Sequence, residues 1–179
     1  MKTQSLLAAF IVLFVVASVT PVRAENPADF TVESALDSSR FQLSKHRGQI
    51  VVLHFLLKTE CPYCLRYTHD YAALAETTPG VFHIFLKPDS DADIDVWASK
   101  LRSDDLKGVP VIYRDPNAKL ADEFGIPDGY KFHGQTVHYP ALVALGADGK
   151  ELFRYVGKSN ADRLSVAAFT AKLAEAVKQ

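Results

Sequence analysis

Residues 50–64 read IVVLHFLLKTECPYC and carry most of what the sequence says about architecture. The run at 50–57 is almost continuously apolar, as is typical of a strand that is buried on both faces of a sheet. Residues 61–77 then have the composition of a helix, with Pro62 suited to its first turn. A buried strand that leads into a helix indicates a parallel β-α-β unit, so the sequence predicts an α/β domain with two cysteines at the junction.

The rest of the chain alternates strands and helices. Further strands are predicted at residues 30–32, 41–43, 81–86, 109–113, 137–145 and 151–156. Helical spacing of apolar residues, or a cap, predicts helices around 94–101, 116–124 and 160–177, and the last of these is expected to start at Asn160 and to bury Val166, Phe169, Leu173 and Val177. Residues 125–135 are interpreted as loop, and Asp148-Gly149 as the turn of a closing hairpin. These elements predict one domain with a central mixed sheet flanked by helices, an N-terminal hairpin and an inserted helix–strand unit.

The first 24 residues resemble a signal peptide. Lys2 gives a positive start, and the apolar run at 6–19 is 14 residues long, below the roughly 20 that a spanning helix needs. Cleavage is predicted before Glu25, which leaves a single mature domain at 25–179. An uncleaved membrane anchor is the alternative. The chain has no Asn-x-Ser/Thr sequon, which favours a bacterial periplasm over a glycosylating secretory route.

Composition excludes several classes of protein. The formal net charge of −1 gives no electrostatic footprint for nucleic acid, so no nucleic-acid partner is expected. Two cysteines are too few for a disulfide-stapled scaffold, and no cysteine–histidine grouping has zinc-finger spacing. We expect a monomeric domain without a bound cofactor or metal.

Cys61-Pro62-Tyr63-Cys64 carries the predicted chemistry. At a helix start, unpaired backbone N–H groups and the helix dipole stabilise an anion, so Cys61 is expected to be a thiolate nucleophile. Cys64, one turn into the helix, is placed to resolve the mixed disulfide. The pair itself would be the redox centre. A structural disulfide is one alternative, which the short spacing suits less well, and a metal site is the other, for which the chain has no second cysteine pair.

A strand, a Cys-x-x-Cys at a helix start and a late hairpin resemble the thioredoxin fold. Cys-Pro-Tyr-Cys with Lys58 three residues before it is similar to glutaredoxins, but 75 residues separate Cys64 from Pro140, too many for a plain thioredoxin or glutaredoxin. This length is similar to the redoxin group, which includes the TlpA-like exported thiol oxidoreductases and the AhpC/TSA peroxiredoxins. Residues 43–57, 89–97 with 111–117, and 139–149 carry the resemblance.

The resemblance implies a substrate site beside the dithiol. Pro140 corresponds to the cis-proline of this fold, which leaves the preceding backbone free to pair with a bound peptide, and Tyr139 would line the same groove. Pro62 and Tyr63 complete the expected substrate-binding set. The sequence departs from the family pattern at Glu60, where many members have Trp, and we expect this carboxylate to raise the pKa of the Cys61 thiol against the effects of Lys58 and the helix dipole.

A peroxidase is the first alternative function. Peroxiredoxins have a Thr or Ser three residues before the reactive cysteine and an arginine on the late strand. Here Thr59 lies two residues before Cys61, and Tyr139 and Pro140 occupy the expected arginine position.

A copper-binding module is the second alternative. Two thiolates and an imidazole suit copper, and Sco-type copper chaperones share this fold and use a late-hairpin histidine, near which His138 stands. Those proteins have one more residue between their cysteines. A lone strand histidine such as His138 is more often structural, and the same holds for His54, whose alternative role is to shuttle a proton for Cys64.

The sequence therefore predicts an exported, thioredoxin-fold thiol–disulfide oxidoreductase of the TlpA-like redoxin type. Protein thiols or disulfides are its expected substrates. An electron donor or acceptor that the sequence does not identify would recharge the Cys61–Cys64 pair.

Overall fold

The computed structural model describes residues 27–58, 61–101, 107–132 and 135–178 of the 179-residue chain. The predicted signal segment 1–24 and the cleavage site before Glu25 lie outside these residues and stay predictions. Within these ranges, no helix is both long and apolar enough to span a membrane.

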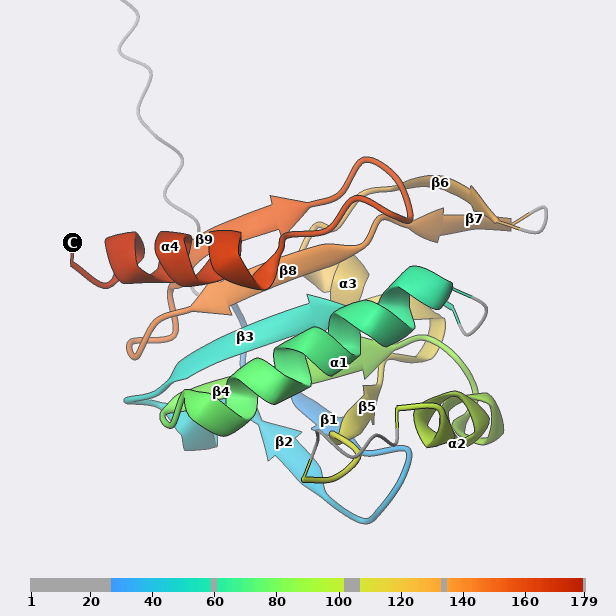
Figure 1. The fold of residues 1–179 in the computed structure, drawn as a ribbon, viewed down its shortest axis with the longest axis horizontal. Coiled ribbons are helices and arrows are strands. Elements are labelled where there is room, and N and C mark those ends of the chain that lie inside the picture. The colour runs from blue at the N-terminus through green and yellow to red at the C-terminus, as the bar shows by residue number, and fades with distance from the viewer. Residues whose placement is uncertain (1–26, 59–60, 102–106, 133–134, 179) are drawn as a thin grey trace, which may run out of the picture.

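A five-stranded sheet forms the centre of the domain, in the order β5-β4-β3-β8-β9 (Figure 1). Its strands are β3 (Ile50–Phe55), β4 (Val81–Lys87), β5 (Ile112–Arg114), β8 (Ala141–Leu145) and β9 (Glu151–Val156). β3, β4 and β5 run parallel, whereas β8 and β9 each run antiparallel to their neighbours. The predicted mixed sheet is therefore confirmed.

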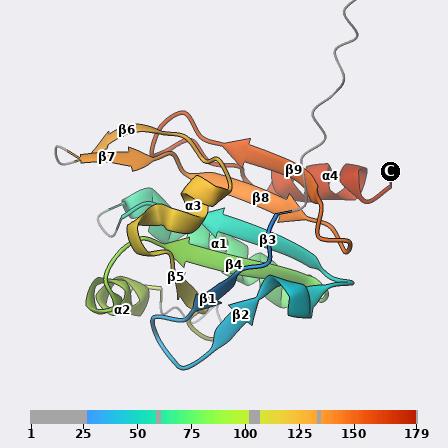
Figure 2. The ribbon, with the colours of Figure 1, turned by 180° about the vertical axis from the view of Figure 1, so that it is seen from behind.

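Helices and a hairpin cover the two faces of this sheet. The helices are α1 (Pro62–Thr77), α2 (Asp91–Ser99), α3 (Lys119–Glu123) and α4 (Val166–Ala176), with 3-10 turns η1 (Leu43–His46) and η2 (Pro116–Ala118). α1 and α4 lie in front of the sheet in Figure 1, and Figure 2 shows α3 and the hairpin of β1 (Thr31–Glu33) and β2 (Arg40–Gln42) on the other side.

The side chains of β3 alternate between the two faces, as the period of a strand requires. Val52 belongs to the hydrophobic cluster under α1, α2 and α4. Val51, Leu53 and Phe55 belong to a second cluster under the β1–β2 hairpin and α3. This double burial explains why residues 50–57 are apolar almost without interruption, and it confirms β3 as a central strand.

The structure corrects the prediction of a loop at 125–135 and of one long strand at 137–145. β6 (Asp128–Phe132) pairs with β7 (Gln135–His138) in a separate hairpin, and β8 begins only at Ala141. Because proline has no N–H to donate to a strand ladder, Pro140 separates β7 from β8. In both views the β6–β7 hairpin extends past the sheet at the end where α1 begins (Figures 1 and 2).

The expected cis-proline is wrong: the described residues contain no cis peptide bond, so Pro140 is trans. Two backbone hydrogen bonds hold the chain at Tyr139 and Pro140, between β7 and β8. The Tyr139 N–H donates to the Pro127 carbonyl at 2.9 Å, and the Gly157 N–H donates to the Pro140 carbonyl at 2.8 Å. The trans form is the more stable isomer of X-Pro bonds by about 0.5–1 kcal/mol, and these contacts are compatible with it.

The start of the last helix also differs from the prediction. Ser165 is its N-cap and accepts a hydrogen bond from the Ala168 N–H at 3.3 Å, whereas Asn160 lies upstream in the loop. Val177 follows the helix and is 54% exposed, so it is not part of the buried stripe. Asn and Ser are equally good cap residues, and the sequence pattern alone does not choose between them.

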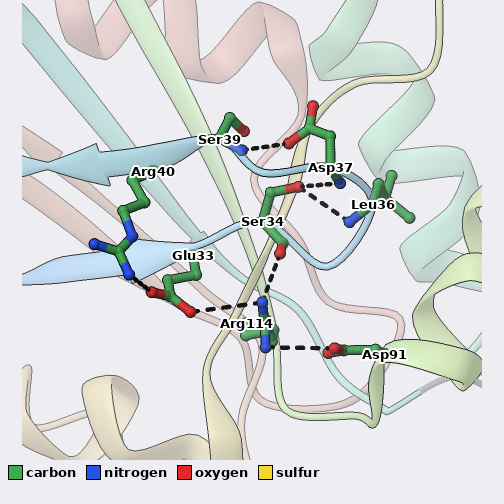
Figure 3. A network of polar contacts seen from close by, with 8 residues as sticks. All are labelled: Glu33, Ser34, Leu36, Asp37, Ser39, Arg40, Asp91 and Arg114. Atoms are coloured by element: carbon green, nitrogen blue, oxygen red, sulfur yellow. Dashed lines mark hydrogen bonds and ion pairs between the residues drawn. The ribbon is translucent and has the colours of Figure 1, made fainter.

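Arg114 attaches the N-terminal hairpin to α2 (Figure 3). Its guanidinium donates to the Ser34 carbonyl at 3.0 Å and lies 3.3 Å from the Asp91 carboxylate and 3.6 Å from that of Glu33. Glu33 also pairs with Arg40 on β2. Since β1 and β2 form a sheet of their own, this network holds the hairpin against the domain.

We expect Arg114→Met to lower the free energy of unfolding by about 1–2 kcal/mol, because it removes a partly buried, charge-assisted hydrogen bond and two ion pairs. Arg40→Met is the matched control: its side chain is 69% exposed, and a surface pair contributes about 0–1 kcal/mol. Urea unfolding of both variants measures the difference. Equal losses would show that Arg114 does not attach the hairpin.

Candidate functional site

Cys61 and Cys64 lie at the N-terminus of α1, as predicted. Cys61 is the N-cap residue, and the Cys64 N–H donates to its carbonyl at 3.1 Å. Both residues are free thiols and both are buried, Cys64 completely. Pro62 opens the helix and is exposed, and Tyr63 is 48% exposed beside the two thiols.

Arg163 contacts both sulfur atoms. Its Nη2 lies 3.4 Å from Cys61 Sγ and 3.1 Å from Cys64 Sγ. The guanidinium also lies over the ring of Tyr67, 5.3 Å from its centre, at a distance suited to a cation–π contact. A permanent positive charge at hydrogen-bonding distance from sulfur stabilises a thiolate.

These contacts move the pKa values of the two thiols in opposite directions. The hydrogen bond from the Cys64 thiol, together with the charge of Arg163, lowers the pKa of Cys61 to about 5 although burial opposes the change. Burial raises the pKa of Cys64 well above its usual range, and its hydrogen bond to Cys61 adds to this. At neutral pH the site therefore holds a thiolate on Cys61 and a protonated thiol on Cys64.

The loop between β9 and α4 is held so that it presents Arg163. The Asp162 carboxylate accepts hydrogen bonds from the Tyr155 hydroxyl and, at 2.9 Å, from the Lys158 N–H. On the other side of Arg163, the Leu164 carbonyl accepts a hydrogen bond from the buried Tyr71 hydroxyl at 3.0 Å. The two residues that flank Arg163 are thus both anchored.

Gly157 lets this loop fold back closely. A Cβ atom at this position would lie 2.1 Å from the Asp162 carbonyl oxygen, far inside van der Waals contact. A side chain at Gly157 would therefore push away the backbone that precedes Arg163.

The buried Lys87 and Cys64 both contact the Leu57 carbonyl. Lys87, fully buried at the end of β4, donates to the Leu57 carbonyl at 2.7 Å and pairs with Asp89 at 3.0 Å. The same carbonyl is 3.9 Å from Cys64 Sγ, and the charge of Lys87 opposes the burial that raises the pKa of Cys64. The ammonium group also lies 4.5 Å from the centre of the Trp97 ring.

His54 is a hydrogen-bonded core residue, which confirms the favoured interpretation. Its Nδ1 lies 2.8 Å from the Tyr67 hydroxyl and its Nε2 lies 2.9 Å from Nδ1 of His83. Burial lowers the pKa of His54 well below its ordinary value and that of His83 to about 4. Since both ring nitrogens of His54 bond to other residues, its alternative role as a direct proton shuttle for Cys64 gains no support.

The two predicted groove residues are placed differently. Pro140 is buried and lines a small cavity together with Tyr67 and Arg163, so it lies near the dithiol. The Tyr139 ring packs against Gly129 in the β6–β7 hairpin, where a Cβ would lie 3.2 Å from it. Thr59 and Glu60 lie outside the described residues, so the expected effect of Glu60 on Cys61 stays a prediction.

His138 does not join the cysteines. Its ring is buried, and Nδ1 lies 2.7 Å from the Tyr139 carbonyl oxygen. It lines a separate cavity of about 220 Å³ with Leu57 and Lys58. Across the part of the chain that the structure describes, no three His, Cys, Asp or Glu side chains are grouped to hold a metal, so the geometry does not favour the copper alternative.

Sequence reasoning missed Arg163 and Lys87. Arg163 lies 99 residues after Cys64 in a polar loop, and no local pattern marks it. Lys87 left a weaker signal, because this lysine ends a strand that is apolar except for His83 and it precedes the break at Pro88.

The profile of the AhpC/TSA family matches residues 23–150. The chain belongs to the AhpC/TSA family. No curated protein matches the sequence closely enough to count as a relative. The family match and the similar solved structures described next confirm the expected redoxin with a thioredoxin-like fold.

Solved structures with the same fold include oxidoreductases and peroxiredoxin-like proteins. This chain is similar to an exposed lipoprotein thioredoxin of Streptococcus pneumoniae (TM-score 0.63, 22% identity, 83% of this chain and 99% of the other). It is also similar to a secreted Mycobacterium tuberculosis disulfide oxidoreductase homologous to DsbE of E. coli (TM-score 0.60, 18% identity, 82% and 95% of the chains). A peroxiredoxin-like protein of Aquifex aeolicus gives a TM-score of 0.69 at 11% identity over 86% of each chain. At these identities the likeness concerns the fold alone.

The reduced protein should titrate one thiolate with a midpoint near pH 5, the pKa to which Cys61 is lowered. Thiolate absorbance at 240 nm measures this, and Cys61→Ser should abolish the transition. Arg163→Gln should raise the midpoint by about one to three pH units, because an adjacent opposite charge lowers a pKa by about that amount. Arg66→Gln, which removes an arginine that does not touch the sulfurs, should leave it unchanged; a matching rise there would contradict the role of the Arg163 contact.

The oxidised protein should lose stability as the pH falls from about 6.5 to 4. Unfolded histidines protonate near 6.5, whereas burial keeps His54 and His83 neutral in the fold until lower pH, near 4 for His83. The unfolded state then binds more protons, which costs up to about 1.4 kcal/mol per pH unit for each ring. His83→Gln should flatten this slope in urea unfolding between pH 4 and 8, and an unchanged slope would contradict the assignment.

Proposed function

We propose that this protein is an exported thiol–disulfide oxidoreductase in which Cys61 attacks and Cys64 resolves. The contact of Arg163 with both sulfurs, at 3.4 and 3.1 Å, carries the proposal, because it stabilises a thiolate on the first cysteine of a Cys-x-x-Cys at a helix start. Membership of the AhpC/TSA family supports a redox role.

The exchange reaction follows from the two protonation states. The Cys61 thiolate attacks one sulfur of a substrate disulfide, a mixed disulfide forms, and the first substrate thiolate leaves and takes up a proton. Cys64 then loses its proton and attacks Cys61 Sγ, which forms the Cys61–Cys64 disulfide and releases the second substrate thiolate. The substrate disulfide gains two electrons and the protein dithiol loses two.

The dithiol is the redox centre, so the proposal requires no bound cofactor or metal. Protein thiols or disulfides are the proposed substrates, and a separate electron donor or acceptor must restore the starting state. We propose a monomer that does not bind nucleic acid. Pro62, Tyr63, Tyr139 and Pro140 are the proposed substrate-contacting residues, of which Tyr63 is exposed beside the cysteines and Pro140 shares a cavity with Arg163.

Export to the periplasm or the extracellular space is part of the proposal. The predicted signal segment at 1–24 supports it, and an oxidising compartment allows a disulfide such as Cys61–Cys64 to persist.

The two cysteine variants should fail at different steps. Cys61→Ser should reduce the rate of insulin disulfide reduction by dithiothreitol to the uncatalysed level, because the attacking thiolate is absent. Cys64→Ser should still attack but accumulate a mixed disulfide, detectable by mass spectrometry, because the resolving thiol is absent. The same two variants should differ in this way with any disulfide substrate.

The reduction potential of the pair separates this function from its alternatives. A value between about −270 and −120 mV is expected for an exchange catalyst, whereas a value well below about −300 mV indicates a structural disulfide. Equilibration of the domain at 25–179 with glutathione or dithiothreitol measures it. Oxidation of Cys61 by hydrogen peroxide far faster than that of an ordinary thiol would favour the peroxidase instead.

A further inference from the structure

A cavity of about 560 Å³ lies beside the dithiol, between α1 and the chain that enters α4. Tyr63, Arg66 and Arg163 line it, and the Tyr67 ring and Leu164 contribute to its wall. We call it the arginine cavity. Arg163 relates it to the dithiol, because this residue lines the cavity and its Nη2 also touches both sulfurs.

Two positive charges face the arginine cavity. Arg66 follows Tyr63 by three residues and therefore projects from the same side of α1. It is exposed, and it forms no ion pair with another residue that the structure describes. Arg163 also lines the cavity, and Nη2 is the guanidinium nitrogen that contacts the two sulfurs.

The acidic group of the cavity lies away from the dithiol. Asp70 also lines it, four residues beyond Arg66 and seven beyond Tyr63, and therefore about 6 Å and about 10 Å further along the helix from these two residues. Its carboxylate lies 3.7 Å from Nδ1 of His69. Arg163 is the charged lining residue that contacts the sulfurs, and the N-cap Ser165 of α4 lines the cavity as well.

We propose that the arginine cavity binds a carboxylate of the disulfide substrate, so that this protein acts preferentially on acidic disulfides. The inference rests on the exchange reaction proposed above and names its substrate class. The carboxylate would lie a few bonds from the sulfur that Cys61 attacks, in reach of Arg66 and Arg163.

The shape and chemistry of the cavity favour a carboxylate in particular. Guanidinium groups bind planar carboxylates through paired hydrogen bonds, and such bonds are stronger than those between neutral groups. The tyrosine rings provide an apolar wall for the short methylene chain between carboxylate and sulfur. The source is either a small acidic disulfide or an Asp or Glu beside a cysteine of a protein substrate.

Arg163 has two proposed roles, since it stabilises the Cys61 thiolate and would also bind the substrate carboxylate. The experiment must therefore distinguish substrate binding from thiolate activation. Arg66 is suited to this, because it lines the cavity but does not touch the sulfurs. The comparison of charged and neutral disulfides within one variant also cancels the intrinsic reactivity of its thiolate.

The test uses three small disulfides of similar size: 3,3′-dithiodipropionate (anionic), 2-hydroxyethyl disulfide (neutral) and cystamine (cationic). Stopped-flow loss of thiolate absorbance at 240 nm gives the rate at which each oxidises the reduced protein. We expect the anionic disulfide to react at least about tenfold faster than the neutral one and cystamine to react slowest, with the preference falling as salt screens the charges. Arg66→Gln should reduce the anionic-to-neutral ratio several-fold, and Arg66→Glu should shift the preference toward cystamine.

Peptide disulfides with Glu or Gln beside the cysteine distinguish the two sources. A preference for the Glu peptide indicates an acidic residue of a protein substrate, and a preference confined to dithiodipropionate indicates a small acidic disulfide; either supports the proposal. Equal rates for all three small disulfides, or a ratio that Arg66→Gln does not change, would overturn it. Failure of the Cys64→Ser variant to form a mixed disulfide with the neutral disulfide would instead refute the exchange reaction itself.

Discussion

The contact between one guanidinium and two sulfur atoms is the constraint on which the site depends. The guanidinium of Arg163 supplies the positive charge that the two sulfurs meet. That charge acts only while the side chain stays within hydrogen-bonding distance of Cys61 and Cys64. Much of the surrounding structure fixes it there: the Tyr67 ring lies beneath it, Asp162 and Leu164 are anchored on either side, and Gly157 lets the loop approach closely.

The same region buries several polar groups that a hydrophobic core would normally exclude. An unpaired buried charge or ring nitrogen costs several kcal/mol, and pairing offsets most of that cost. Lys87 is accordingly bonded to a carbonyl and a carboxylate, and His54 bonds to Tyr67 and His83. The Tyr67 hydroxyl therefore links α1 to His54 on β3, and His54 in turn bonds to His83 on β4. The bond to His54 holds the ring over which the Arg163 guanidinium lies. The contacts that position Arg163 beside the dithiol thus run from α1 into β3 and β4 of the sheet.

Patterns within a few neighbouring residues predicted the elements whose formation depends on those residues alone. The apolar run at 50–57 identified the central strand because burial on both faces leaves no polar alternation, and the cysteines were placed at the helix start because Pro62 suits its first turn. The β6–β7 hairpin was missed because glycine and polar residues there resemble a loop. Arg163 was missed for a different reason: its role depends on a contact across 99 residues, which periodicity and spacing do not encode. Pro140 lies between the two cases: its position as a strand break follows from its missing N–H, whereas the expected cis isomer rested on the family resemblance and the structure has the trans form.

The low pKa of Cys61 has more effect on the direction of exchange than on the speed of attack. A thiol with the ordinary pKa of 9.0 is about 1% thiolate at pH 7, and one with a pKa of about 5 is almost fully ionised, a gain of about 100-fold in population. Nucleophilicity falls with pKa, by about 40- to 100-fold over four pH units, so the two effects nearly cancel in the attack step. The stabilised thiolate is, however, a better leaving group. Its ionisation also favours the reduced protein over the oxidised one, because it changes their equilibrium constant by up to about 100-fold at pH 7. This factor corresponds to a rise of no more than about 60 mV in the reduction potential. The hydrogen bond from Cys64 and the charge of Arg163 together therefore shift the Cys61–Cys64 couple toward the oxidising end of the range for exchange catalysts. The raised pKa of Cys64 leaves the potential at neutral pH unchanged, because that thiol is protonated in either case.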